Sequence, residues 1–138
     1  MTIREYINNN FSQWMKINHF TEHHYGLSRQ EAYKLLTYCN RTGCFEGDKE
    51  EILAHILKVA TDSENTKKIL EWYTNCDDRE FFVIYTKTLP KNIGGFVYER
   101  GDNISRPRKV WGMKIIFQRT VINNQRTFWI KSAMPSGT

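Results

Sequence analysis

The hydrophobic pattern of this chain changes from a helical period to a strand period near residue 80, and this change limits the architectures open to it. Up to about residue 75, apolar residues recur at spacings of three and four, as in helices that bury one face. From residue 81 they come in β-rich runs and in alternation, as in strands. The pattern predicts an α+β fold with N-terminal helices (1–75) packed beside a basic, mainly antiparallel C-terminal sheet (80–138).

The predicted helices begin at Thr2, Ser28 and Asp48, each followed three residues later by a glutamate, which is the pattern of a capping box. The second helix is expected to end at Gly43, because glycine is common just after a helix. A shorter fourth helix is predicted over 64–73. These segments carry apolar stripes of the kind that face a core.

The segment Cys76–Asp78 separates the helices from the predicted strands, which cover 81–87, 96–99, 110–119 and 127–134. Asn123-Asn124 is a turn signal between the last two. Strict alternation in the last strand places Phe128, Ile130, Ser132 and Met134 on one face and Trp129, Lys131 and Ala133 on the other.

At 138 residues the chain is expected to be one domain (1–138) with a core of its own. Its three cysteines, Cys39, Cys44 and Cys76, are an odd number without zinc-type spacing, so they are interpreted as reduced thiols or as one fortuitous pair, which favours a cytoplasmic place of action. No apolar run is long enough to span a membrane, and no signal peptide is recognised. The chain could equally be a piece of a longer secreted protein.

Positive charge gathers in the second half. Residues 81–138 hold ten Lys and Arg against Glu99 and Asp102 alone, a net charge of +8, whereas residues 1–80 carry −3. Such a field attracts polyanions, because Lys and Arg release the counterions condensed on phosphates. Together with 14% aromatic residues, this favours nucleic acid as the partner. A merely solubilising surface is the alternative.

Three of the four histidines fall between the first two predicted helices: His19, His23 and His24. Histidine accepts and donates protons near neutral pH, and connecting segments often carry functional groups. A zinc site is disfavoured because no cysteine or carboxylate set completes a tetrahedron. A solvated, histidine-rich loop remains a competing interpretation.

Other residues could complete an acid–base site. Lys34 or Arg29 could stabilise a charged phosphorane, and Ser132 could hold a phosphate oxygen. Trp129 and Tyr98 could stack on bases. No phosphate-binding glycine loop, nucleophile elbow or metal motif is recognised, so metal-free acid–base cleavage of RNA is the simplest enzymatic chemistry, with no cofactor expected.

Three stretches together resemble the bacterial ribonuclease-A-like toxin domains of contact-dependent growth-inhibition proteins. His19-x4-His24 followed by Tyr25-Gly26-Leu27-Ser28 is similar to the family's opening H-x4-H-V-G-K-T. Ile69–Trp72 matches its I-x2-W stretch, and the ending T-A-Y-P corresponds to Ser132–Pro135. The likeness spans about residues 19–135. The wider group of barnase-, colicin- and RelE-like toxin nucleases also ends in a basic sheet.

The resemblance implies that His24 is the catalytic histidine and His19 a supporting one. The family's helix arginine would fall at Leu35, so Lys34 takes that role only with a shift of one residue. Ser132 keeps the hydroxyl of the family's threonine. Met134 replaces its tyrosine and loses the phenol, and Lys131 and Tyr98 are the candidates to take over that role.

We therefore predict a metal-independent endoribonuclease toxin domain, delivered as part of a larger protein to a target-cell cytoplasm and neutralised by an immunity protein. The expected catalytic residues are His24, His19, Lys34 and Ser132, and the expected RNA-binding residues are Arg29, Lys131, Trp129, Arg126 and Met134. Two alternatives explain the charge equally well: a non-catalytic nucleic-acid-binding protein, and a module that docks an acidic protein, such as an inhibitor.

Overall fold

The computed structural model describes residues 1–75 and 79–137 and has an α+β architecture, as the sequence predicts. The helical elements are α1 (Ile3–Ile17), the π-helical turn η1 (Phe20–His24), α2 (Arg29–Lys34), the 3₁₀ turn η2 (Leu35–Thr37), α3 (Lys49–Ala60) and α4 (Ser63–Thr74). The strands are β1 (Arg41–Glu46), β2 (Phe81–Tyr85), β3 (Gly94–Glu99), β4 (Val110–Ile122) and β5 (Gln125–Gly137). The expected boundary at Cys76–Asp78, with its cysteine, lies outside the described residues.

The helix starts follow the capping signals. Thr2 and Glu5 form a complete capping box at α1, and Ser28 and Glu31 form another at α2. The side chain of Asp48 accepts from the Glu51 amide at the start of α3. These bonds satisfy amides that the first helical turn leaves without partners.

A long hairpin dominates the second half. Strands β4 and β5 pair antiparallel around Asn123 and Asn124, whose φ angles of 51° and 64° fit a two-residue turn of the primed type. Strand β2 pairs with the other edge of β4, so the order in this sheet is β2-β4-β5. Among the described residues, no helix is long and apolar enough to cross a membrane.

The second predicted helix is wrong beyond Lys34. The chain passes through η2 and then forms β1, which pairs antiparallel with β3. Gly43 lies inside this strand opposite Val97 and ends no helix. A Cβ at Gly43 would stand 3.1 Å from Cγ of Pro135, so the missing side chain lets β1 pack closely against β5. The first half is thus not purely helical.

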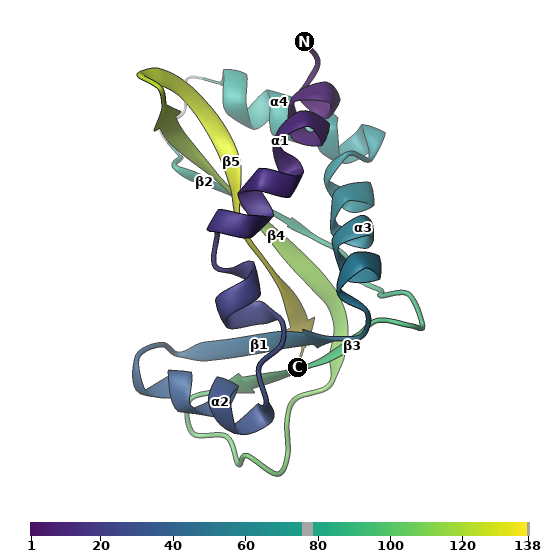
Figure 1. The fold of residues 1–138 in the computed structure, drawn as a ribbon, viewed down its shortest axis with the longest axis vertical. Coiled ribbons are helices and arrows are strands. Elements are labelled where there is room, and N and C mark those ends of the chain that lie inside the picture. The colour runs from purple at the N-terminus through teal and green to yellow at the C-terminus, as the bar shows by residue number, and fades with distance from the viewer. Residues whose placement is uncertain (76–78, 138) are drawn as a thin grey trace.

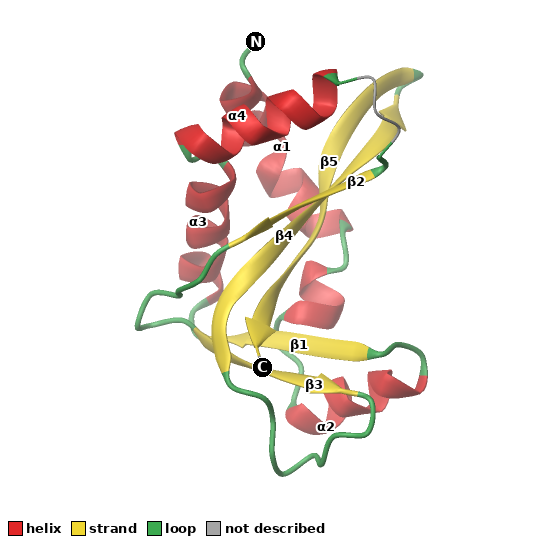
Figure 2. Ribbon diagram, turned by 180° about the vertical axis from the view of Figure 1, so that it is seen from behind, coloured by secondary structure: helices red, strands yellow, loops and turns green. Residues whose placement is uncertain are grey.

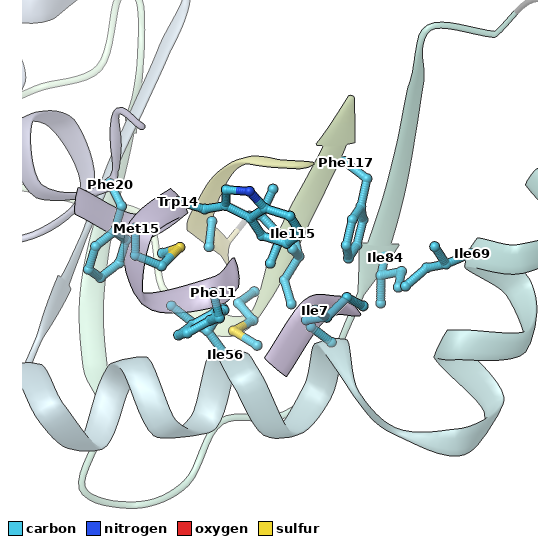
Figure 3. Close-up of a cluster of buried hydrophobic side chains, with 14 of the residues drawn as sticks. Ile7, Phe11, Trp14, Met15, Phe20, Ile56, Ile69, Ile84, Ile115 and Phe117 are labelled. Carbon is cyan, nitrogen blue, oxygen red and sulfur yellow. The ribbon is translucent and has the colours of Figure 1, made fainter. Parts of the chain in front are cut away.

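Helices α1 and α3 cover one face of the β2-β4-β5 sheet, and the view from behind shows the strands without these helices in front of them (Figure 1, Figure 2). The main core fills the space between them, with side chains from α1, α3, α4 and the sheet, including Ile7, Trp14, Ile56, Ile69, Ile115 and Phe117 (Figure 3). A second apolar cluster joins α2 to β1 and β3 through Ala32, Cys44, Phe96 and Tyr98. Each of the two sheets thus packs on its own apolar cluster.

Candidate functional site

A cavity of about 710 Å³ brings the two ends of the sequence together. The three clustered histidines line one part of it, and Lys131, Ser132 and Met134 of β5 line another. Arg41 and Thr42 of β1 also contribute, and the floor is apolar, formed by Phe81, Val83 and Ile116. These apolar residues alternate along their strands with core residues, so the cavity lies on the sheet face opposite the main core.

The backbone of β1 orients His24. Its Nδ1 lies 2.8 Å from the carbonyl oxygen of Gly43, and because a carbonyl only accepts, Nδ1 donates the proton. In the neutral ring the lone pair is then on Nε2. Burial is the main cause that lowers the pKa of His24 to about 4; the bond to Gly43 opposes this, and the charges of His23, His19 and Lys114 add to it. The imidazole is therefore neutral near pH 7.

The supports of η1 are buried and fixed. Asn18, just before the turn, donates from Nδ2 to the carbonyl of Ile130 in β5 at 3.0 Å, and its Oδ1 accepts from the Phe20 amide at 3.0 Å. The Phe20 ring is fully buried. The segment that carries the histidines is thus held against β5 by the Asn18 hydrogen bonds and by the buried Phe20 ring, so it is not a free loop.

Two buried hydroxyls in the cavity wall have no hydrogen-bond partner that the structure describes. Thr42 and Ser132 are each 5% exposed, and neither Thr42 Oγ1 nor Ser132 Oγ has a hydrogen-bond partner within the described part of the chain. A buried hydroxyl left unpaired costs about 1–3 kcal/mol. Such groups are rare unless a ligand or water completes them. A ligand rich in oxygen atoms would satisfy both.

A β-bulge places Ser132 at the cavity. The pairing of β4 with β5 passes from Phe117 opposite Ile130 to Ile116 opposite Ser132, which leaves Lys131 as the extra residue. A bulge reverses the alternation of side chains beyond it.

The expected faces of the last strand are therefore wrong. Phe128, Ile130 and Ala133 belong to the core, whereas Ser132 and Met134 line the cavity. Phe128 and Ile130, expected on the same face as Ser132 and Met134, lie on the opposite face. Lys131, the extra residue of the bulge, lines the cavity, and its ammonium lies 4.8 Å from the ring centroid of Phe81.

Three cations surround the site. Arg41 and Lys131 line the cavity, and Arg41 is partly neutralised by Glu99, with 2.7 Å between Nη1 and Oε1. Lys114 stands on the same face of β4 as Ile116, opposite Met134 of β5. Burial, and next the charge of Arg41, lower the pKa of the Lys114 ammonium.

Lys114 is half-buried, and among residues 1–75 and 79–137 no carboxylate lies within salt-bridge distance of it. Burying an unpaired ammonium is unfavourable. An anion in the cavity would compensate for that loss. Sequence reasoning missed this residue, as it missed Arg41 and Thr42.

The helix cations named from the sequence lie elsewhere. Lys34 ends α2, and Arg29 at its start places its guanidinium 5.9 Å from the ring centroid of Phe96. Neither lines the cavity, whereas Leu35 does. The position that the family resemblance assigns to a helix arginine thus reaches the site, but in this chain it carries leucine.

Three other candidates also stand apart. Arg126 follows the hairpin turn, and its carbonyl accepts from the Tyr73 hydroxyl at 2.9 Å. Trp129 is half-buried and does not line the cavity; it packs against the main core, and its Nε1 donates to Gln118 Oε1. Tyr98 is fully buried in the second apolar cluster, so its ring is not available to stack on a base.

Two signals could have revealed the missed residues. The alternation of β4 places Lys114 on the face opposite Met113 and Ile115, which marks it as a cation facing away from the core. Arg41 and Thr42 precede a short apolar run, Gly43–Phe45, which is compatible with a buried strand. Their place in the cavity depends on the pairing of β1 with β3, which no local sequence pattern predicts.

One group among the described residues has the composition of a metal site. His19, Glu22 and His23 each offer a ligand atom, and these atoms lie within 4.8 Å of one another. Glu22 thus adds one carboxylate to two imidazoles, which together are three of the four ligands of a tetrahedral site.

No protein-family model matches the chain, and no curated protein matches its sequence. Among solved structures, the chain is similar to one chain of the CdiA-CT/CdiI complex from Y. kristensenii 33638. The TM-score is 0.63 at 16% sequence identity, and the match covers 86% of this chain and 99% of that chain. At this identity the likeness establishes a shared fold.

Proposed function

We propose that the chain is a metal-independent endoribonuclease domain of a contact-dependent growth-inhibition toxin. The observation that carries the proposal is that His24 shares a cavity walled by cations with two buried hydroxyls, Thr42 and Ser132, that have no hydrogen-bond partner among the described residues. A base, an anion cradle and unpaired positive charge are what cleavage of a phosphodiester by its own 2′-hydroxyl requires.

In this reaction His24 Nε2 accepts the proton of the ribose 2′-hydroxyl. The 2′-oxygen bonds to phosphorus, the bond from phosphorus to the 5′-oxygen breaks, and His19, acting as the general acid, gives a proton to the leaving oxygen. The products are a 2′,3′-cyclic phosphate and a free 5′-hydroxyl. Thr42 and Ser132 donate to the non-bridging oxygens, and their bonds strengthen as negative charge grows in the pentacovalent state.

Charge and aromatic surface supply affinity for the rest of the strand. Lys131 and Lys114 replace the helix cations Lys34 and Arg29 as the positive groups beside the phosphate. Phe81 and Tyr38 are exposed at the cavity and offer ring faces to unstacked bases. Met134 lines the cavity without a proton donor, and Lys131 is placed to fill the part of the family's tyrosine.

The toxin part of the proposal is supported by the fold shared with a chain of the CdiA-CT/CdiI complex. By this reasoning the domain reaches a target-cell cytoplasm as part of a larger protein and is neutralised by an immunity protein. The same fold likeness fits a second candidate, a non-catalytic partner or inhibitor, because the similar chain belongs to a complex of two different proteins.

Incubation of the purified protein with total RNA in EDTA tests the proposal. We expect cleavage with 2′,3′-cyclic phosphate ends, and a loss of about 10²–10⁴-fold in rate for His24→Ala. His55→Ala is the matched control, because His55 is another half-buried histidine, on α3 and outside the cavity. RNA that is bound but never cut would favour the non-catalytic candidate, and a fully active His24→Ala variant would overturn the mechanism.

A further inference from the structure

His19, Glu22 and His23 stand on one turn of the chain with the spacing i, i+3, i+4, which brings their side chains to the same side of a helix. The His23 amide donates to the His19 carbonyl at 2.9 Å, so a backbone hydrogen bond links the two residues across one helical turn. The ring centroids of His19 and His23 are 5.1 Å apart, and His23 Nε2 lies 3.9 Å from Glu22 Oε2. π-Helical turns are rare and often occur at functional sites.

We propose that these three side chains form a binding site for a zinc-class divalent cation. Two imidazoles and one carboxylate are a donor set that Zn²⁺ accepts, with a fourth position left for water or a ligand. Two histidines four residues apart on one helical turn can chelate a single ion. The set has too few oxygens for Ca²⁺ or Mg²⁺.

The ligands are already close to the required separations. Bonds of 2.0–2.1 Å in a tetrahedron place ligand atoms about 3.4 Å apart. The largest separation in the cluster is within 4.8 Å, and His19 and Glu22 are exposed, so their side chains are free to rotate by the small amount needed. The backbone below them is fixed by Asn18 and the buried Phe20.

The site adjoins the cavity, because His19 and His23 both line it. If the proposed ribonuclease function holds, a metal bound to His19 occupies the ring nitrogen that would otherwise carry the proton for the leaving oxygen. The metal also adds two positive charges beside His24. Zinc would then inhibit a nuclease that needs no metal. This consequence rests on the proposed function, whereas the metal site itself does not.

Titration of the chelator-treated protein with Co²⁺, followed by displacement with Zn²⁺, tests the site without any RNA. We expect the visible absorption bands of four-coordinate Co²⁺ with nitrogen and oxygen ligands, and their loss on adding Zn²⁺. Glu22→Gln and His23→Ala should each weaken Zn²⁺ binding by at least about 10–100-fold, because loss of even an outer-shell partner has that effect. The control Glu71→Gln, an exposed helix glutamate, should bind as the wild type does.

Absence of the Co²⁺ bands, or equal Zn²⁺ affinity in the wild type and Glu22→Gln, would overturn the site. An intense thiolate-to-metal band would also overturn it, since that would assign the metal to a cysteine, such as Cys39 in the same cavity wall. As a second readout, the Zn²⁺ concentration that halves RNA cleavage should rise in Glu22→Gln by the same factor as the dissociation constant. A protein that binds Co²⁺ as expected but cuts no RNA would support the site and remove the proposed nuclease.

Discussion

Replacing Thr42 with valine should make the fold more stable and the cleft less active. Valine has nearly the shape of threonine and suits a β-strand, so Thr42→Val removes one buried oxygen without a partner and leaves the packing in place. Relief of the unpaired hydroxyl should raise the free energy of unfolding by about 1–3 kcal/mol. For a domain of this size each kcal/mol corresponds to a rise of about 3–5 °C in Tm.

The same substitution should weaken RNA cleavage. A hydrogen bond from a hydroxyl to a charged oxygen contributes about 1.5–3 kcal/mol. Since about 1.4 kcal/mol is a factor of ten in rate, kcat/KM should fall roughly 10–150-fold. Ser132→Ala should change both quantities in the same directions, because Ser132 Oγ is equally buried and unpartnered among the described residues.

Thr61→Val is the matched control. The Thr61 hydroxyl donates to the Leu57 carbonyl at 2.7 Å and lies at the end of α3, outside the cavity. Its loss should lower stability by about 0.5–1.5 kcal/mol and leave cleavage unchanged. Thermal unfolding and initial rates on a fluorogenic RNA oligonucleotide in EDTA measure the two effects. A Thr42→Val protein that is destabilised like Thr61→Val, or that cleaves at the wild-type rate, would refute the reasoning.

Three further predictions follow from other parts of the structure. Lys114→Met should lower kcat/KM at least about tenfold on the same oligonucleotide, whereas the control Lys91→Met, which replaces an exposed lysine, should not change it. Equal rates for both variants would mean that no substrate anion lies beside Lys114. The Arg108 side chain and next the Glu99 amide lower the pKa of Asp102. The ionised carboxylate therefore stabilises the fold above the ordinary pKa of aspartate, and this stabilisation is lost as the pH falls. In acid unfolding, Asp102→Asn should lose less stability between pH 6 and pH 3 than the wild type does, and an equal loss would contradict this. At pH 8 a thiol reagent should modify Cys39 quickly and Cys44 only on unfolding, since burial raises the pKa of the Cys44 thiol; peptide mass mapping checks the order.

Local signals predicted the elements that local chemistry decides. The capping residues Thr2, Ser28 and Asp48 mark helix starts because their side chains bond amides only two or three residues away. Asn123 and Asn124 mark the hairpin because they tolerate positive φ. These elements needed no knowledge of the rest of the chain.

The failures share a tertiary cause. The segment after Lys34 leaves its helix to form β1, which is stabilised by pairing with β3 more than fifty residues away and by the close approach of Gly43 to Pro135. The bulge at Lys131 likewise follows from pairing with β4 and moves Ser132 out of the core face. Neither event has a local sequence signal.

The candidate site was therefore foreseen only in part. The residues themselves point to the histidine cluster and to Ser132, the family resemblance singles out His24, and His24 and Ser132 do line one cavity. The sequence predicts the supporting cation on the helix after the histidines, but Lys34 and Arg29 do not line the cavity. Lys131 of β5 does line it, and the charge of Lys114 of β4 acts on the pKa of His24. Spacing along a helix cannot tell which distant strand will complete a site.

Titration with inorganic phosphate, followed by NMR of the labelled protein, tests most directly whether both ends of the chain build one phosphate site. The His24 ring and the Ser132 amide should shift together, with one shared Kd that weakens in Thr42→Val. Shifts confined to exposed basic residues such as Arg126, or different Kd values for His24 and Ser132, would contradict the account.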